Sequence, residues 1–299
     1  ELDVLGLIDQ DPAVEGHRNI LLDPNWATGD LTYRLYDTLL SALPSLPDMP
    51  EKMGFALDTC RGGHLRDGSA DFRFEIAEDG GLILRADGCD AGRPVTEATA
   101  IDALKDMAQW FVSSSGRDAG RMARHLKNVP LPAEWQTTPP RSAAADVTPG
   151  PAPNGTVLGA AFGKIDTTAL RDLLNDTGAE QIRLMLGRMF LLRGGSAPAP
   201  SQHFVSRAGD PILKAHACPG APFCPQATVE TRKLATRLAA QTDHVLHVSG
   251  CSKGCALPRA CAVTLVGRDG AFDLVKNGAP WDIPSQTGLA PDTISLKDL

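Results

Sequence analysis

The sequence predicts an α+β fold, in which helical and strand patterns follow one another without a regular βαβ alternation. Apolar residues recur with helical spacing in 28–43 and 101–114, and they alternate with polar residues in 71–77. Two Asp-Gly turns, one in each half of the chain, mark β-hairpins. With 299 residues, 42% of them hydrophobic, the chain is long enough to bury a sizeable core.

The first half is predicted to contain a helix, a buried strand, a hairpin and a second helix. Leu35 and Leu39 belong to the apolar stripe of the first helix, which ends at Pro44. Asp79 and Gly80 supply the left-handed turn residues of the hairpin. The predicted segments are the helix 28–43, the strand 53–58, the hairpin strands 71–77 and 82–84, and the helix 101–114.

The composition changes in 131–155, where prolines alternate with alanine, serine and threonine. Such a segment is typical of an extended linker. Because unstructured loops of this length are uncommon inside one domain, we interpret it as a domain boundary.

The second half is predicted to repeat the same mixture of elements. Asp269 and Gly270 form its hairpin turn, so each half has a hairpin of the same type, a weak sign of internal duplication. The predicted strands are 157–162, 182–186, 189–192, 245–248, 263–267 and 272–275, and the predicted helices are 167–175 and 229–240.

Charge and composition exclude several classes of function. The net charge of -7 argues against general nucleic-acid binding, which needs a basic surface. No apolar stretch approaches the 18 or more residues of a membrane span, and no secretory signal is visible. Seven cysteines, an odd number, argue against a disulfide framework. We therefore expect a cytoplasmic protein that binds neither nucleic acid nor a membrane.

Four clustered cysteines are the most informative feature. Cys218 and Cys224 are separated by five residues, and Cys251 and Cys255 follow, separated by three. Four thiolates on two glycine- and proline-rich loops suit an iron–sulfur cluster. Structural zinc and inert buried thiols are the alternatives, although the five-residue gap is unusual for a zinc knuckle. The isolated Cys60 and Cys89 are interpreted as packing residues, because nothing near them in the sequence completes a site.

The cysteine pattern resembles the [4Fe–4S] signature of the sirohaem-dependent nitrite and sulfite reductase superfamily. Within it, the sequence is similar to the precorrin-3B synthase family of aerobic cobalamin biosynthesis from about residue 4 to 280. The segments that carry this resemblance are EKMGFALD at 51–58, ACPGAP at 217–222, HVSGCSKGC at 247–255 and VTLVGRDG at 263–270.

The resemblance implies a nitrite/sulfite reductase-like architecture, in which ferredoxin-like halves accompany duplicated sulfite-reductase-type α+β units. We expect the N-terminal ferredoxin-like half to precede residue 1. The implied parts are the tail of that region and a connecting helix (1–49), a first sulfite-reductase-type unit (50–130), the linker (131–155), a second ferredoxin-like half (156–210) and a second sulfite-reductase-type unit with the cluster (211–299).

The resemblance also implies a set of ligands. Cys218, Cys224, Cys251 and Cys255 would hold [4Fe–4S]. The superfamily's Lys-x-Lys, which grips an anionic substrate, is represented by Lys52 alone, since Gly54 stands at the second position. The loss of one charge-assisted contact makes sulfite or nitrite reduction less favourable. Another departure is Ala262, where the superfamily prefers an acidic residue.

The implied activity is the O2-dependent hydroxylation of precorrin-3A at C20 with formation of a γ-lactone. It would need the cluster, a mononuclear iron, NADH as external electron donor and an electron-donating reductase. The alternatives are a sirohaem nitrite or sulfite reductase and a non-catalytic iron–sulfur electron-transfer module. Because no dinucleotide fingerprint is present, NADH must act transiently or through a partner.

The tetrapyrrole substrate carries many carboxylates, so its pocket needs cationic residues. Lys52, Arg188 and Lys253 are the substrate-binding candidates, and Lys253 lies inside the cysteine loop. His216 and His247 are candidates for binding iron or for donating hydrogen bonds near the cluster. The wider set of cationic candidates comprises Arg61, Arg66, Arg183, Arg193 and Arg259.

Overall fold

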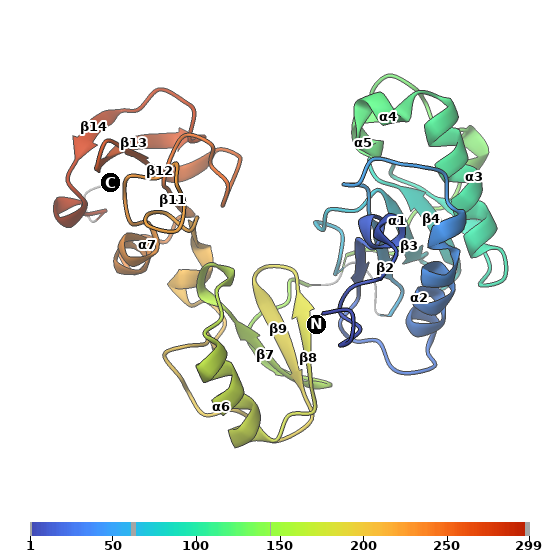
Figure 1. Ribbon diagram of the computed structural model, residues 1–299, viewed down its shortest axis with the longest axis horizontal. Helices are drawn as coiled ribbons and strands as arrows, with labels where there is room; N and C mark the ends of the chain where they lie inside the picture. Colours follow the sequence, from blue (N-terminus) through green and yellow to red (C-terminus); the bar gives the residue numbers. More distant parts are fainter. Residues whose placement is uncertain (1, 61–63, 144, 297–299) are drawn as a thin grey trace. The chain divides into compact units, whose positions relative to one another are not determined.

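The computed structural model describes residues 2–60, 64–143 and 145–296. The chain divides into two compact units, residues 1–147 and 148–299 (Figure 1). Among the described residues, no helix combines the length and the apolar character needed to cross a membrane.

The first unit is built on a five-stranded sheet whose strands lie in chain order. The first two pairings are parallel and the last two are antiparallel. The strands are β1 (Ile20–Leu22), β2 (Phe55–Asp58), β3 (Phe72–Ile76), β4 (Leu82–Ala86) and β5 (Arg93–Val95). The helices and 3-10 turns are α1 (Pro12–Gly16), α2 (Leu31–Ala42), η1 (Leu43–Ser45), α3 (Ala100–Ser113), α4 (Gly116–Ala119), α5 (Met122–His125) and η2 (Ala133–Trp135).

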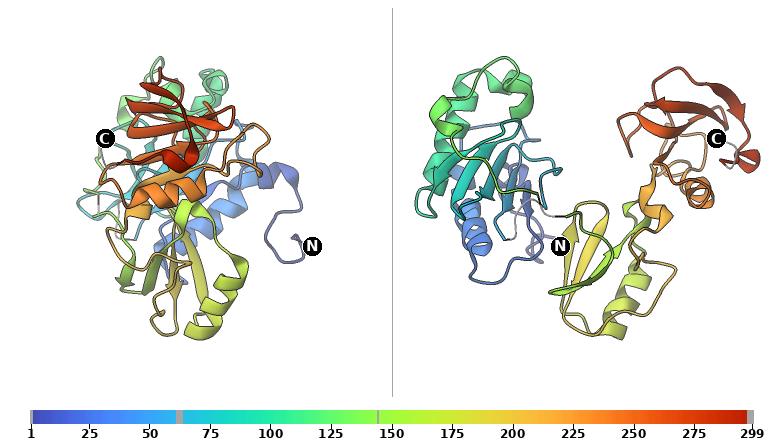
Figure 2. Two further views of the ribbon diagram at one scale, coloured as in Figure 1. Left: turned by 90° about the vertical axis from the view of Figure 1, so that its left-hand side faces the viewer. Right: turned by 180° about the vertical axis from the view of Figure 1, so that it is seen from behind.

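Helices α2 and α3 lie on one side of this sheet, as Figures 1 and 2 show from opposite directions. Their apolar residues Leu35, Leu39 and Phe111 share a core with Phe55 and Phe72 of the strands. The rings of Phe55 and Phe72 stack with centroids 5.6 Å apart. The predicted apolar faces therefore meet in a single core.

The opposite face of the first sheet is polar and nevertheless buried. Arg73 Nε donates to Asp87 at 2.8 Å, and Arg85 Nε donates to Glu75 at 2.5 Å. Arg73 also donates to two carbonyl oxygens of the loop 64–68, which covers this face. Buried charges need such partners to offset the cost of leaving water.

The second unit begins with an antiparallel four-stranded sheet of order β6-β7-β9-β8. Its elements are β6 (Gly150–Ala152), β7 (Gly155–Gly159), η3 (Ala161–Gly163), α6 (Thr167–Thr177), β8 (Gln181–Met185) and β9 (Met189–Arg193). Leu173 of α6 packs with Leu158, Phe190 and Leu192 of the strands, so the helix covers one face of this sheet.

A second five-stranded sheet completes this unit, again with its strands in chain order. Its elements are η4 (Pro211–Lys214), β10 (Ala215–Ala217), α7 (Arg232–Ala239), β11 (Leu246–Ser249), β12 (Cys261–Arg268), β13 (Ala271–Gly278), β14 (Gln286–Leu289) and η5 (Pro291–Thr293). Leu234 and Leu238 of α7 pack against Val248, Leu265 and Leu274 on one face of the sheet.

The two five-stranded sheets have the same topology. In each, a strand, a helix and a second strand form a parallel pair, a third strand adds in parallel, and two antiparallel strands follow. The duplication suggested by the two hairpins therefore extends to the whole sheet.

Most predicted elements occur at their expected positions, with ends that differ by up to three residues. The strand predicted over 157–162 ends at Gly159, because Phe162 adopts a left-handed conformation within η3. The helix predicted over 229–240 spans only Arg232–Ala239. Within the predicted linker, the chain forms bridges from Thr138 and Pro140 to the first unit, and the units divide after residue 147.

Candidate functional site

The two cysteine pairs lie at one edge of the second five-stranded sheet. Cys218 directly follows β10, and Cys224 lies between it and α7. Cys251 and Cys255 lie between β11 and β12. Because β10 and β11 are parallel, the loops that follow them emerge at the same edge.

The two loops touch each other. The amide of Gly250 donates a hydrogen bond to Cys218 Sγ at 3.1 Å. A Cβ at Gly250 would lie 2.7 Å from that of Ala227, and a Cβ at Gly267 would lie 2.3 Å from Val229 Cγ2. Glycine is therefore required where the cysteine loops approach the sheet and each other.

Cys218 and Cys255 line one pocket of about 210 Å³, together with Arg188, His216 and Arg232. Cys218 is buried and Cys255 is exposed. All seven cysteines are free. Among the described residues, no three or more His, Cys, Asp or Glu side chains are arranged to hold a metal ion. The fold thus brings the two loops together without bringing all four sulfur atoms to one point.

The chemistry of this edge fits a bound iron–sulfur group. Free thiols on two touching loops match the donors that such a cluster takes, and the Gly250 amide already faces a sulfur atom. Both ring nitrogens of His247 are buried without a hydrogen-bond partner in the described structure, and so is Nε of Arg232. Unpartnered buried polar atoms next to the cysteine loops are expected where a bound group supplies their partner.

Two histidines lie side by side on the polar face of this sheet. His216 of β10 pairs with His247 of β11, and both side chains point away from the α7 core. Burial lowers the pKa of His247 to about 4. Burial and the nearby charge of Arg188 lower the pKa of His216 to about 4 as well. Both imidazoles are therefore neutral at pH 7, the form that donates one hydrogen bond and binds metals.

The cationic candidates have different surroundings. Arg188, in a left-handed turn before β9, donates to the carbonyl oxygens of Leu213 and Ala215, both at 2.6 Å. Its guanidinium thus links the two sheets of the second unit while it lines the cysteine pocket. Lys253 is exposed in the cysteine loop, whereas Lys52 is exposed in the first unit, just before β2.

Arg61 lies outside the described residues, and Arg188 is the one predicted cation among the described residues that line the cysteine pocket. Arg66 donates to the carbonyl oxygen of Arg141 in the first unit. The pocket also contains Arg232, which the sequence-based prediction missed. Its position at the start of the helix that follows Cys224 is the signal that identifies it.

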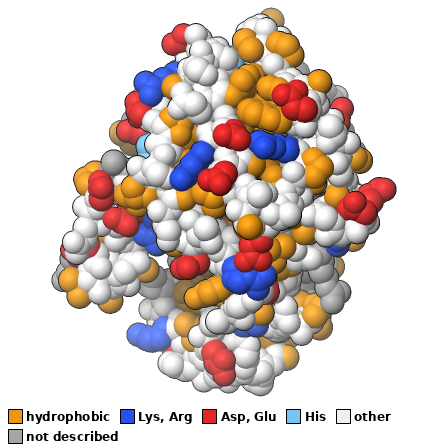
Figure 3. Space-filling model, turned by 90° about the vertical axis from the view of Figure 1, so that its right-hand side faces the viewer, with side chains coloured by type: hydrophobic (Ala, Val, Ile, Leu, Met, Phe, Trp, Pro, Cys, Tyr) orange, Lys and Arg blue, Asp and Glu red, His pale blue; other side chains and the backbone are white. Residues whose placement is uncertain are grey.

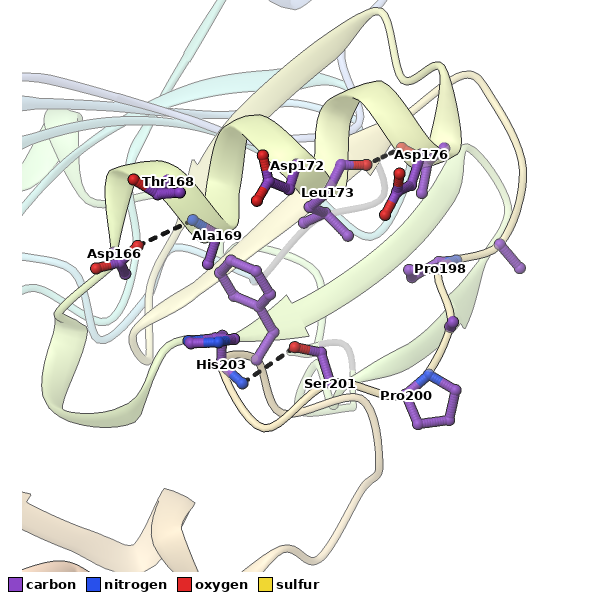
Figure 4. Close-up of a pocket in the computed structure, with 14 residues that line it drawn as sticks. Asp166, Thr168, Ala169, Asp172, Leu173, Asp176, Pro198, Pro200, Ser201 and His203 are labelled. Atoms are coloured by element: carbon purple, nitrogen blue, oxygen red, sulfur yellow. Dashed lines mark hydrogen bonds between the residues drawn. The ribbon is translucent and has the colours of Figure 1, made fainter.

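Another pocket, of about 450 Å³, lies beside α6 (Figure 4). Asp166, Asp172 and Asp176 line it, with His203 opposite. Asp166 accepts a hydrogen bond from the Ala169 amide at 2.9 Å, which lowers the pKa of that carboxyl. Three carboxylates would repel an anionic substrate, so this pocket does not suit a carboxylate-rich tetrapyrrole.

The face shown in Figure 3 carries acidic and basic side chains close to one another rather than in separate patches. On this face the mixture differs from the basic stripe of nucleic-acid-binding proteins.

Comparison with known proteins supports the resemblance. No protein-family model matches the sequence. The chain is 32% identical over 228 residues to a precorrin-3B synthase of Sinorhizobium sp, an alignment that covers 69% of this chain and 49% of the relative. The chain therefore spans about half the length of that relative.

Among solved structures, the chain is similar to the NirA protein of Mycobacterium tuberculosis, with a TM-score of 0.52 and 18% identity. The match covers 93% of this chain and 65% of NirA. The likeness confirms the nitrite/sulfite reductase-like α+β fold. The resemblance to precorrin-3B synthases stated from the sequence is likewise confirmed.

Proposed function

We propose that this chain is the part of a precorrin-3B synthase that carries its iron–sulfur cluster. The observation that carries the proposal is the meeting of two free-thiol loops at one sheet edge, in a chain related to a precorrin-3B synthase. Cys218, Cys224, Cys251 and Cys255 would hold a [4Fe–4S] cluster, which supplies electrons one at a time when bound.

The proposed reaction inserts one oxygen atom into precorrin-3A. One atom of O2 is added to the product at C20, and a γ-lactone forms. The other oxygen atom leaves as water. NADH supplies the two electrons through a reductase partner, and one proton from solvent balances the reaction. A mononuclear iron is proposed in addition, with no ligands assigned.

The residues of the cysteine pocket, and Lys253 in the neighbouring cysteine loop, have separate roles in this proposal. Arg232 and Lys253 attract carboxylates of the tetrapyrrole, while Arg188 holds the pocket wall in place through Leu213 and Ala215. Lys52, in the first unit, is a further substrate-binding residue in this proposal. The neutral imidazole of His247 remains buried and donates a hydrogen bond to the bound group.

A cytoplasmic location is part of the proposal, because seven free thiols suit a reducing compartment. The second candidate function is a sirohaem-dependent nitrite or sulfite reductase, favoured by the NirA-like fold. The third, an electron-transfer module, would have a redox-active cluster and bind no tetrapyrrole.

The test begins with anaerobic reconstitution, followed by iron and sulfide analysis and a visible spectrum of the same sample. We expect the broad absorption of an iron–sulfur cluster, iron in excess of sulfide and no sharp haem bands. The variant Cys218→Ser should lose the cluster, and Cys261→Ser, a matched change on β12, should retain it.

Turnover with precorrin-3A, NADH, a reductase and ¹⁸O₂ should then add one labelled oxygen atom to the product. Intense sirohaem bands with reduction of nitrite or sulfite would replace this proposal by the second candidate. A cluster without tetrapyrrole binding would replace it by the third.

A further inference from the structure

Two buried aspartates lie together at the edge of the first five-stranded sheet. Leu22 of β1 pairs with Leu57 of β2 in a parallel ladder, so the residues that follow, Asp23 and Asp58, are neighbours. Their exposed fractions are 0% and 1%. Both belong to the polar face of the sheet, opposite the core that α2 and α3 cover.

Each carboxylate has one oxygen atom that accepts hydrogen bonds from its own loop. Asp23 Oδ1 accepts hydrogen bonds from the amide and the side chain of Asn25 at 2.8 and 3.0 Å, and Asp58 Oδ2 accepts from the Leu65 amide at 2.9 Å. Asp23 Oδ2 and Asp58 Oδ1 are buried without a hydrogen-bond partner among the described residues.

Two arginines of this face, Arg73 and Arg85, form ion pairs with other carboxylates. Arg73 pairs with Asp87, and Arg85 pairs with Glu75, the strand neighbour of Asp58. A buried, unpaired carboxylate pair costs free energy unless a cation binds to it.

The same position in the duplicated sheet is the edge that carries the cysteine loops. Ala217 of β10 pairs with Val248 of β11, and the residues that follow are Cys218 and Ser249. Asp23 therefore occupies the position of Cys218, and Asp58 occupies that of Ser249. By the same register Cys60 corresponds to Cys251. At this equivalent position the first sheet has the carboxylate of Asp23, and the second has the thiol of Cys218.

We propose that Asp23 Oδ2 and Asp58 Oδ1 bind a divalent metal ion that prefers oxygen ligands, of the Mg²⁺ and Mn²⁺ class. Such ions are commonly held by one or two carboxylates together with water or other oxygen ligands, which would complete the coordination here.

The neighbouring groups favour oxygen ligands over sulfur. Thr32 Oγ1 lies 2.7 Å from Thr59 Oγ1 and 3.1 Å from Cys60 Sγ. Cys60 Sγ is engaged with Thr32 Oγ1 and donates to Asp30 Oδ2 at 3.9 Å, so the sulfur already has other partners. Cys60, interpreted from the sequence as a packing residue, is therefore a neighbour of the site rather than a ligand.

The test is a titration of the whole chain with Mn²⁺, in which electron paramagnetic resonance measures the free ion. We expect one bound Mn²⁺ per chain and competition by Mg²⁺. Asp23→Asn and Asp58→Asn should each weaken binding by more than the roughly 10- to 100-fold that loss of an outer-shell partner costs. Both changes keep a hydrogen-bond acceptor of nearly the same shape, so the loop bonds to Asn25 and Leu65 persist.

Two controls separate this site from the rest of the molecule. Glu78→Gln removes an exposed carboxylate of the first hairpin and should leave Mn²⁺ affinity unchanged. Cys218→Ser should also leave it unchanged, because the cysteine loops belong to the other unit. The proposal is overturned if no Mn²⁺ binds, or if both aspartate variants bind it as tightly as the unaltered chain. It does not depend on the proposed function, whose test measures iron, sulfide and oxygen transfer.

Discussion

The buried imidazole of His247 should make the second unit less stable in acid. Its pKa falls from 6.5 to about 4 in the folded protein because of burial. Between these two pKa values, His247 is protonated in the unfolded chain and neutral in the folded chain. Stability is therefore fully present above pH 6.5 and is lost as the pH falls toward 4.

The magnitude follows from the same two pKa values. At pH 5 the unfolded chain gains about 2 kcal/mol relative to the folded one from this group, rising to about 3 kcal/mol near pH 4. The variant His247→Leu, of similar volume, has no proton to take up. The difference in pH sensitivity between the two proteins then measures the contribution of His247, including its effect on the pKa of His216.

The assay is urea unfolding of reduced, cluster-free protein at pH 7 and pH 5, followed by circular dichroism. We expect the unaltered chain to lose about 2 kcal/mol more than His247→Leu between the two conditions. His244→Leu, an exposed control on the same segment, should behave like the unaltered chain. Equal losses for His247→Leu and the unaltered chain would refute the assigned burial of a neutral imidazole.

Two further changes test how the cysteine edge is built. Gly267→Ala should cost about 2–3 kcal/mol by overpacking and lower iron content after reconstitution, since its Cβ would also lie 2.8 Å from the Gly250 carbonyl oxygen. Gly16→Ala, which meets open space, should have neither effect in thermal unfolding or iron analysis. Arg188→Met should cost about 2 kcal/mol in urea unfolding, because two carbonyl oxygens lose their donor. Arg207→Met, an exposed change, serves as its control, and equal stability of the two variants would contradict the linking role of Arg188.

The elements that have a clear local sequence pattern were predicted correctly. The stripe of Leu35 and Leu39 identified α2, and the turns at Gly80 and Gly270 identified both hairpins. The three-residue strands β1 and β10 have no such signal. Each is defined by a partner strand some 30 residues later, which local periodicity does not report.

The site was predictable only in part, for a physical reason. The spacing of the cysteines, and the glycines beside them, predicted that Cys218 and Cys251 lie on two loops of one site. The sequence has no comparable pattern to show that the polar face of the first sheet is buried. The alternation that put Phe74 in the core says nothing about whether the loop 64–68 covers Arg73, or whether Asp58 lies beneath it.

The hydrophobic interiors of the two units have no residue in common. The core that contains Phe55 and Phe111 belongs to residues 1–147, and those that contain Leu265 and Phe190 belong to residues 148–299. A substitution in one interior therefore leaves the packing of the other intact, and energetic effects in the two add independently.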